Sequence, residues 1–141
     1  MTRQFAIIVG SGFEAFAASG EPHRVHTRFA PPSAPIHPVS FERHTVLVLP
    51  RHGDDHSLPP HLINYRANLE ALKDVGANAV IALNTVGVIT EIREPGQIAI
   101  PDQIIDYTWG REHTIYAEAA PGFEHIEFTE PFSSVLRSEL L

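Results

Sequence analysis

The sequence contains no cysteine, and this absence excludes two common ways of stabilising a small domain. Neither a disulfide bond nor a zinc ion held by thiolates can form without that residue. A reducing compartment fits such a composition, and we expect the protein to be cytoplasmic.

Long apolar segments and clusters of positive charge are also missing. The apolar run at 5–9 is too short for a signal-peptide core and a cleavage site, and no segment approaches membrane length. The formal net charge is -7, and no run of Lys and Arg forms the cationic face that a nucleic-acid duplex requires. We therefore expect a soluble protein that binds neither membranes nor nucleic acid.

What is present suits one globular domain over residues 1–141, because 43% of the residues are hydrophobic. The twelve prolines and nine histidines are many for this length. Most of the prolines fall in 21–38 and 50–60, which we interpret as ordered loops or turns. Three histidines of the first stretch are expected to be exposed loop residues: His23, His26 and His37.

Three apolar, β-branched runs predict buried strands at 5–9, 44–49 and 79–83. Apolar residues at helical spacing predict a helix from Leu62 to about Val75 that ends at Gly76. Strand, helix and strand in this order predict a βαβ unit with a right-handed crossover. The fold class is therefore α/β, with a mixed, largely parallel sheet and flanking helices.

Weaker patterns predict a short helix at 13–18 and further strands at 97–105 and 124–128. Pro131 to Ser134 has the character of a helix entry, and an apolar stripe follows it without any stop signal. Periodicity alone fits a short natural helix and a cut helix equally well.

A polar loop follows each of the three strong strands, at 10–12, 51–53 and 84–87. Ligands of open α/β sheets collect at the carboxyl ends of the strands. If the strands are parallel neighbours, these loops meet at one edge of the sheet.

The loops together offer donors that suit an oxyanion. Glycines let backbone N–H groups approach an anion closely, and the Arg51 guanidinium is a fork suited to phosphate. Each signal alone is weak, because Gly-Ser-Gly is usually a turn and Arg-His is usually a surface pair. In combination they predict a phosphate or sulfate pocket with these side chains: Ser11, Arg51, His52, Asn84 and Thr85.

Other chemistries fit less well. Metal binding is disfavoured, because Gly53 and the flanking prolines favour a loop around the possible ligands, and their spacing matches no zinc pattern. Those possible ligands are His52, Asp54, Asp55 and His56. The dinucleotide-binding fingerprint fails at Ala15, where its third glycine belongs, and no Walker or Gly-x-Ser-x-Gly pattern occurs.

Several segments carry a specific family resemblance. The sequence resembles the trimeric methylthioadenosine and methylthioinosine phosphorylases from Phe5 to the end. The block Asn64–Asn68, at its spacing from Arg51-His52, is the most specific part, and Asp106–Thr114 looks most like the bacterial methylthioinosine branch. The other matching segments are Leu49–Gly53, Pro59–His61, Asn64–Lys73, Val80–Gly87 and Asp102–Thr108.

The resemblance implies a phosphorylase/hydrolase-like fold and a homotrimer. It implies cleavage of a purine nucleoside by inorganic phosphate to the free base and 5-methylthioribose 1-phosphate, without metal or organic cofactor. Family phosphate contacts fall on the five side chains already named. A further contact, to the 5′-substituent bound by a neighbouring subunit, falls on His125.

The sequence departs from the family in two respects. Ser11 stands where Thr is usual, which keeps the hydroxyl. Family members are also longer, and their further part supplies base and ribose contacts, so we expect a truncated, N-terminal half. Three interpretations stay open: an enzyme subunit or fragment, a catalytically inactive phosphate-binding fragment, and an unrelated nucleotide-binding domain. The block at 64–73 weighs against the third. Preference for 6-oxo or 6-amino purines is not determined by these residues.

Overall fold

The computed structural model describes residues 3–12, 18–89, 94–116 and 125–141. The chain consists of two compact units, Met1–Val86 and Gly87–Leu141, each described by itself below. The single-domain organisation stays a prediction. Within the described ranges, no helix is long and apolar enough to cross a membrane.

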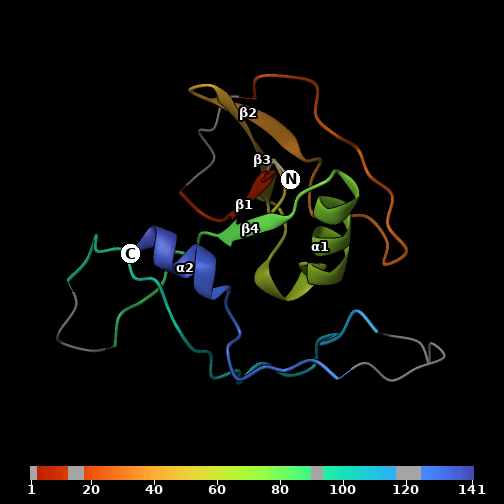
Figure 1. The fold of residues 1–141 in the computed structure, drawn as a ribbon. Coiled ribbons are helices and arrows are strands. Elements are labelled where there is room, and N and C mark those ends of the chain that lie inside the picture. Colours follow the sequence, from red (N-terminus) through yellow and green to blue (C-terminus); the bar gives the residue numbers. More distant parts are fainter. Residues whose placement is uncertain (1–2, 13–17, 90–93, 117–124) are drawn as a thin grey trace. The chain divides into compact units, whose positions relative to one another are not determined.

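The first unit is built on a four-stranded sheet (Figure 1). Its strands are β1 (Phe5–Val9), β2 (His37–Phe41), β3 (His44–Pro50) and β4 (Ala79–Ala82), in the spatial order β2-β3-β1-β4. β1 is parallel to both β3 and β4, and β2 is antiparallel to β3. The predicted mixed, largely parallel sheet and its three strong strands are confirmed.

The register of the sheet brings the carboxyl ends of three strands to one level. Val9 lies opposite Pro50, and Ile8 lies opposite both Leu49 and Ala82. Since parallel strands in register end at the same edge, the loops that follow β1, β3 and β4 leave from that edge together. The predicted convergence of the three polar loops is confirmed.

The core lies between the sheet and helix α1 (Tyr65–Asp74). Its fully or nearly fully buried members are Ala6, Ile36, Leu47, Leu49, Ala71 and Leu72. The helix begins at Asn64, whose side chain accepts a hydrogen bond from the Ala67 N–H, and Gly76 follows its end at φ +88°. The predicted helix is confirmed, but its first turn is a separate 3₁₀ helix, η1 (Pro60–Leu62), because Ile63 is extended.

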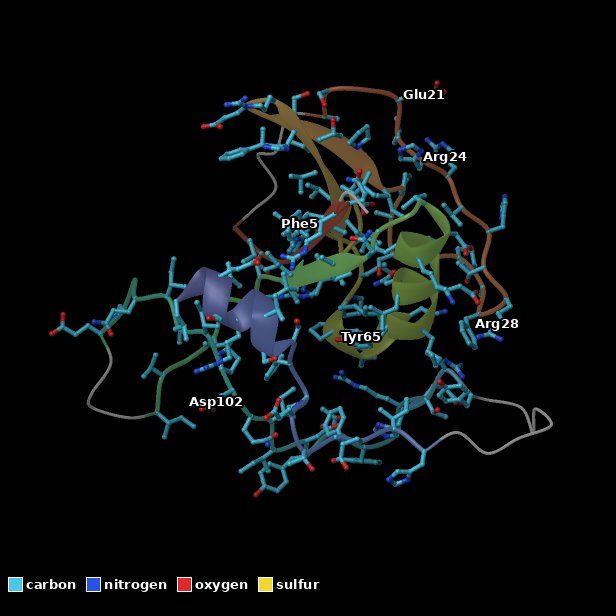
Figure 2. All side chains as sticks on the ribbon, in the orientation of Figure 1. Phe5, Glu21, Arg24, Arg28, Tyr65 and Asp102 are labelled. Carbon is cyan, nitrogen blue, oxygen red and sulfur yellow. The ribbon has the colours of Figure 1, made fainter. Side chains whose placement is uncertain are left out.

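Side chains of α1 hold the Pro-rich loop in place. The buried Asn68 accepts from the Ser33 N–H at 2.7 Å and donates to the Ser33 hydroxyl at 2.9 Å. Asn64 donates to the Phe29 carbonyl, and Glu70 binds the Arg28 guanidinium at 2.7 Å. Figure 2 labels Arg28 on the Pro-rich stretch and Tyr65 at the first residue of α1. The block Asn64–Asn68 thus anchors the Pro-rich stretch at 21–38. This agrees with the prediction that the stretch is an ordered loop.

The Pro-rich stretch also ends in β2, a strand that we did not predict. His-Pro-Val-Ser-Phe has neither a continuous apolar run nor a clear alternation, and its pairing with β3 supplies the order instead. The prediction of His37 as an exposed loop residue is therefore wrong. His37 is half-buried in β2, and its Nε2 lies 2.8 Å from Asp54 Oδ1. His23 and His26 are exposed, as predicted.

The second unit contains α2 (Ser134–Leu140), and Ser133 caps it by accepting from the Leu136 N–H. The predicted helix entry is confirmed. The strands predicted at 97–105 and 124–128 are wrong for the described residues, which have no strand there. A strand needs a neighbouring strand, and none pairs with these segments in the described part of the chain. The helix predicted at 13–18 falls on residues 13–17, outside the described residues.

Candidate anion-binding site at the sheet edge

Arg51 ties the carboxyl ends of three strands together. Its backbone N–H, just after β3, donates to the Val9 carbonyl at the end of β1 at 3.0 Å. Its guanidinium Nη1 donates to the Leu83 carbonyl, just after β4, at 2.7 Å. The cation is thus half-buried and fixed at the edge where the polar loops meet.

Gly10 leaves the space that this guanidinium occupies. A Cβ atom at position 10 would lie 2.1 Å from Arg51 Nη2 and 2.3 Å from Arg51 Cζ, far inside any real contact. The sequence analysis predicted that the loop glycines leave room for an anion, whereas in the structure Gly10 leaves room for the Arg51 guanidinium. Gly12, at φ +90°, serves the turn itself.

Ser11 and Thr85 join the first loop to the third. The Thr85 hydroxyl donates to the Ser11 carbonyl at 3.2 Å, and Ser11 Oγ lies 3.2 Å from His56 Nε2. Ser11, Asn84 and Thr85 are exposed at this edge of the sheet. The loop after β4 follows the sheet edge because the Leu83 N–H donates to the Ile8 carbonyl at 2.9 Å.

The loop after β3 fixes the orientation of the His52 ring. Nδ1 lies 2.8 Å from the Leu58 carbonyl, and a carbonyl only accepts, so Nδ1 carries a proton. Nε2 is therefore the nitrogen left for a ligand, and it donates to an anion only when the ring is an imidazolium. The His56 ring lies beside it, with centroids 4.9 Å apart.

A cavity of about 220 Å³ opens beside these groups. It is several times the roughly 30 Å³ that one water occupies in the liquid, so a small tetrahedral anion fits. Its polar wall comes from two of the three loops and from β2, and includes Gly10, His37, His52, Gly53, Asp54 and His56.

The acidic residues of the 53–57 turn have partners of their own. Asp55 Oδ1 accepts from the Ser57 hydroxyl at 2.6 Å and from the Ser57 N–H at 3.2 Å. These hydrogen bonds, led by the hydroxyl, hold the pKa of the Asp55 carboxyl below its usual value. Asp54 binds His37. Asp55 therefore shapes the turn, whereas Asp54 lines the cavity with its carboxylate held by His37.

The four residues considered as metal ligands make separate hydrogen bonds in the turn that follows β3. Within the ranges that the structure describes, no group of three His, Asp or Glu residues is placed to hold a metal ion. The candidate ligands separate into different contacts, His52 with Leu58 and His56 with Ser11.

The structure brings Ser11, Arg51, His52 and Thr85 together at one sheet edge, with Asn84 in the same loop as Thr85. His125 is exposed in the other unit. Sequence reasoning considered His56 only as a metal ligand and missed its contact with Ser11. Its spacing from His52 suggested a shared face only in a helix, whereas here a turn at φ +56° brings the two rings together.

The fold and the site define an α/β protein with a half-buried arginine fixed at the carboxyl edge of its sheet. The chain belongs to the phosphorylase superfamily, whose family model matches residues 4–141. Curated relatives include a probable S-methyl-5′-thioinosine phosphorylase of Xanthomonas campestris, 46% identical over 96% of this chain and 55% of the relative. The S-methyl-5′-thioadenosine phosphorylase of Pyrococcus horikoshii is 42% identical over 95% and 51%.

Solved structures agree with the curated relatives. A double mutant of adenosine/methylthioadenosine phosphorylase from Schistosoma mansoni, in apo form, matches 99% of this chain and 51% of its own, at a TM-score of 0.87 and 35% identity. The methylthioadenosine phosphorylase of the same organism in complex with tubercidin matches 93% and 48%, at a TM-score of 0.83 and 38% identity. The chain spans about half the length of the relatives that it matches.

Proposed function

We propose that this chain forms the phosphate-binding part of a purine nucleoside phosphorylase, acting on 5′-methylthioinosine or 5′-methylthioadenosine. One observation carries the proposal: the Arg51 guanidinium bridges Gly10 and Leu83 at the edge where Ser11 and Thr85 meet. Relatives named for phosphorolysis of these nucleosides support it.

The proposed site holds inorganic phosphate through Ser11, Arg51, His52, Asn84 and Thr85. As the N-glycosidic bond lengthens, positive charge builds on the ribose, and the bound anion beneath it acts as electrostatic partner and nucleophile. The phosphate oxygen forms the new bond to the ribose carbon, and the electron pair of the broken bond leaves with the purine, which takes up a proton. Arg51 holds the anion close to the ribose carbon, which is a proximity effect, and its fixed positive charge stabilises the bound anion, which is preorganised electrostatics.

The proposal also includes one residue outside the anion site and a preferred substrate. His125 is proposed to contact the 5′-substituent of a nucleoside bound by a neighbouring subunit of a homotrimer. Relatives of both substrate types match, at 46% identity for a thioinosine phosphorylase and 42% for a thioadenosine phosphorylase. The likeness of Asp106–Thr114 to the bacterial branch favours methylthioinosine.

An alternative is a phosphate-binding chain without catalysis, because the chain spans about half the length of its relatives. The two are separated by assaying purine release from each nucleoside with the 141-residue chain and phosphate. We expect no appreciable release. Release that Arg51→Ala abolishes would favour the complete enzyme over the inactive chain.

Phosphate binding is tested by thermal unfolding. Phosphate is expected to raise the Tm in proportion to the logarithm of its concentration, because a ligand that binds only the folded state stabilises it. Arg51→Ala should remove this shift. Arg43→Ala, which removes an equal charge from the exposed turn between β2 and β3, should keep it. A Tm that does not respond to millimolar phosphate contradicts the proposal.

A further inference from the structure

We infer that His56 is a positioning residue of the phosphate site, which acts by donating its Nε2–H to Ser11 and so releases the Ser11 hydroxyl proton toward the anion. The inference rests on the proposed function and adds a residue to it. Three contacts carry it: Ser11 Oγ to His56 Nε2 at 3.2 Å, the His52–His56 ring pair, and the Thr85 hydroxyl on the Ser11 carbonyl.

A serine hydroxyl has one proton to give and lone pairs to receive with. If His56 Nε2 lacks a proton, the Ser11 O–H donates to it, and Ser11 offers only lone pairs to an anion at the sheet edge. The charged oxygens of phosphate then receive no hydrogen bond from Ser11, so this arrangement holds the anion less well. If Nε2 carries the proton, Ser11 Oγ accepts from His56, and its own O–H is free to donate to phosphate.

The anion selects the second arrangement. A neutral imidazole can carry its one proton on Nε2, and an imidazolium carries a proton there as well, so both forms of His56 can donate to Ser11. His52 also needs a proton on Nε2 in order to donate to the anion, and because its Nδ1 already donates to the Leu58 carbonyl, this proton has to be a second one. The other titratable groups that line the cavity are His37 and Asp54, which bind each other. The charged group at the adjoining sheet edge is Arg51, which binds the Leu83 carbonyl. Asp55, on the turn itself, binds Ser57.

The backbone of His56 supports a specific role for the residue. Its φ of +56° lies in the left-handed region, which non-glycine residues seldom adopt and which His, Asn and Asp tolerate best. The Asp55–Ser57 hydrogen bonds hold the turn on either side of it. The turn thus presents the imidazole to Ser11.

The test is a double-mutant cycle on the affinity for inorganic phosphate, measured by calorimetry with the 141-residue chain. The variants are Ser11→Ala, His56→Asn and both together, and His61→Asn in the exposed η1 is the control. Asn suits the left-handed φ and does not titrate. Each single variant is expected to weaken binding roughly tenfold, as losing one hydrogen bond to an anion does. The double variant should be no weaker than the weaker single variant, because His56 acts through Ser11.

Proton uptake gives a second readout that a merely structural residue would not change. The dependence of the binding enthalpy on the buffer's ionisation enthalpy counts the protons taken up with phosphate. The ionisation of phosphate itself is common to all variants, so the wild-type chain should take up more protons than His56→Asn, and His61→Asn should match the wild type. His56→Gly, which also accepts positive φ, replaces His56→Asn if the latter does not fold.

Three results overturn the inference. In the first, the two single effects multiply in the double variant. In the second, proton uptake is equal in the wild type and in His56→Asn, and the ¹⁵N chemical shift of His56 Nε2 shows no bound proton in the phosphate complex. In the third, the wild-type chain binds no phosphate, which overturns the proposed function as well. Phosphate binding that Arg51→Ala abolishes and His56→Asn leaves unchanged refutes the role of His56 alone.

Discussion

The two units of the chain differ in how far they bury their apolar residues. Residues 1–86 contain all four strands and the buried core, whereas the described residues of 87–141 contain α2 and no strand. Ile36 in the first unit is 0% exposed, and Ile98 in the second is 90% exposed. An apolar run becomes a buried strand only when another segment pairs with it and covers it, which local sequence does not report.

The largest expected effect separates the units by one substitution made in each. Ile36→Ala removes a core side chain and should lower the free energy of unfolding by about 2–5 kcal/mol. Ile98→Ala removes the same atoms from an exposed position and should change it by less than about 0.5 kcal/mol. Urea unfolding of both variants gives the two values. Similar losses would mean that Ile98 is buried in solution.

The second comparison concerns two glycines on either side of the boundary. Gly10→Ala forces the Arg51 guanidinium away and should lower the free energy of unfolding by about 1–3 kcal/mol, as overpacking does. The variant should also lose the phosphate-dependent rise in Tm. Gly87→Ala adds the same atom where nothing lies within 4 Å. It should change neither quantity measurably. A Gly10→Ala variant that keeps the phosphate response would show that Arg51 has another way to reach the anion.

Helix caps provide the third comparison. Asn64 caps α1 and also donates to the Phe29 carbonyl, so Asn64→Ala should cost about 1–2 kcal/mol of global stability. Ser133 caps the seven-residue α2, which buries no residue, so Ser133→Ala should fray that helix and leave the urea midpoint unchanged. Amide hydrogen exchange in residues 134–140 detects the fraying. A lower midpoint for Ser133→Ala would show that α2 takes part in the cooperative fold.

The smallest expected effect is common to both units. Asp55 binds the hydroxyl and N–H of Ser57, and Asp106 binds those of Thr108, so the pKa of each carboxyl lies below its usual value of 3.8. Because folding lowers these pKa values, the stabilisation is fully present above about pH 4 and is lost as the pH falls through the folded values. Carboxyl NMR titration should show both pKa values rising toward 3.8 in Ser57→Ala and Thr108→Ala. An unchanged Asp106 pKa would mean that its turn does not persist in solution.

The sequence was informative where chemistry and pairing coincided. The runs predicted as strands at 5–9, 44–49 and 79–83 are rich in β-branched residues, and the first pairs with each of the other two, so their prediction held. β2 escaped prediction because Pro38 and the polar residues beside it hide a strand that β3 stabilises. The run at 97–105 has the local pattern without a partner among the described residues.

The candidate site shows the same division. That three polar loops meet follows from parallel strands whose carboxyl ends are in register. That Arg51 crosses Gly10, that His52 commits Nδ1 to Leu58, and that His56 reaches Ser11 are consequences of turn geometry. The positive φ of His56 belongs to a turn whose conformation the residue types alone leave undetermined.

The guanidinium of Arg51 fills the volume that a side chain at Gly10 would take, so the effects of substitutions at these two positions depend on each other. Any enlargement at position 10 selects for a shorter or differently directed residue at position 51, and the cation is then lost or displaced. Substitution at either position alone is therefore expected to displace the cation, and a change that keeps it at the sheet edge has to involve both residues.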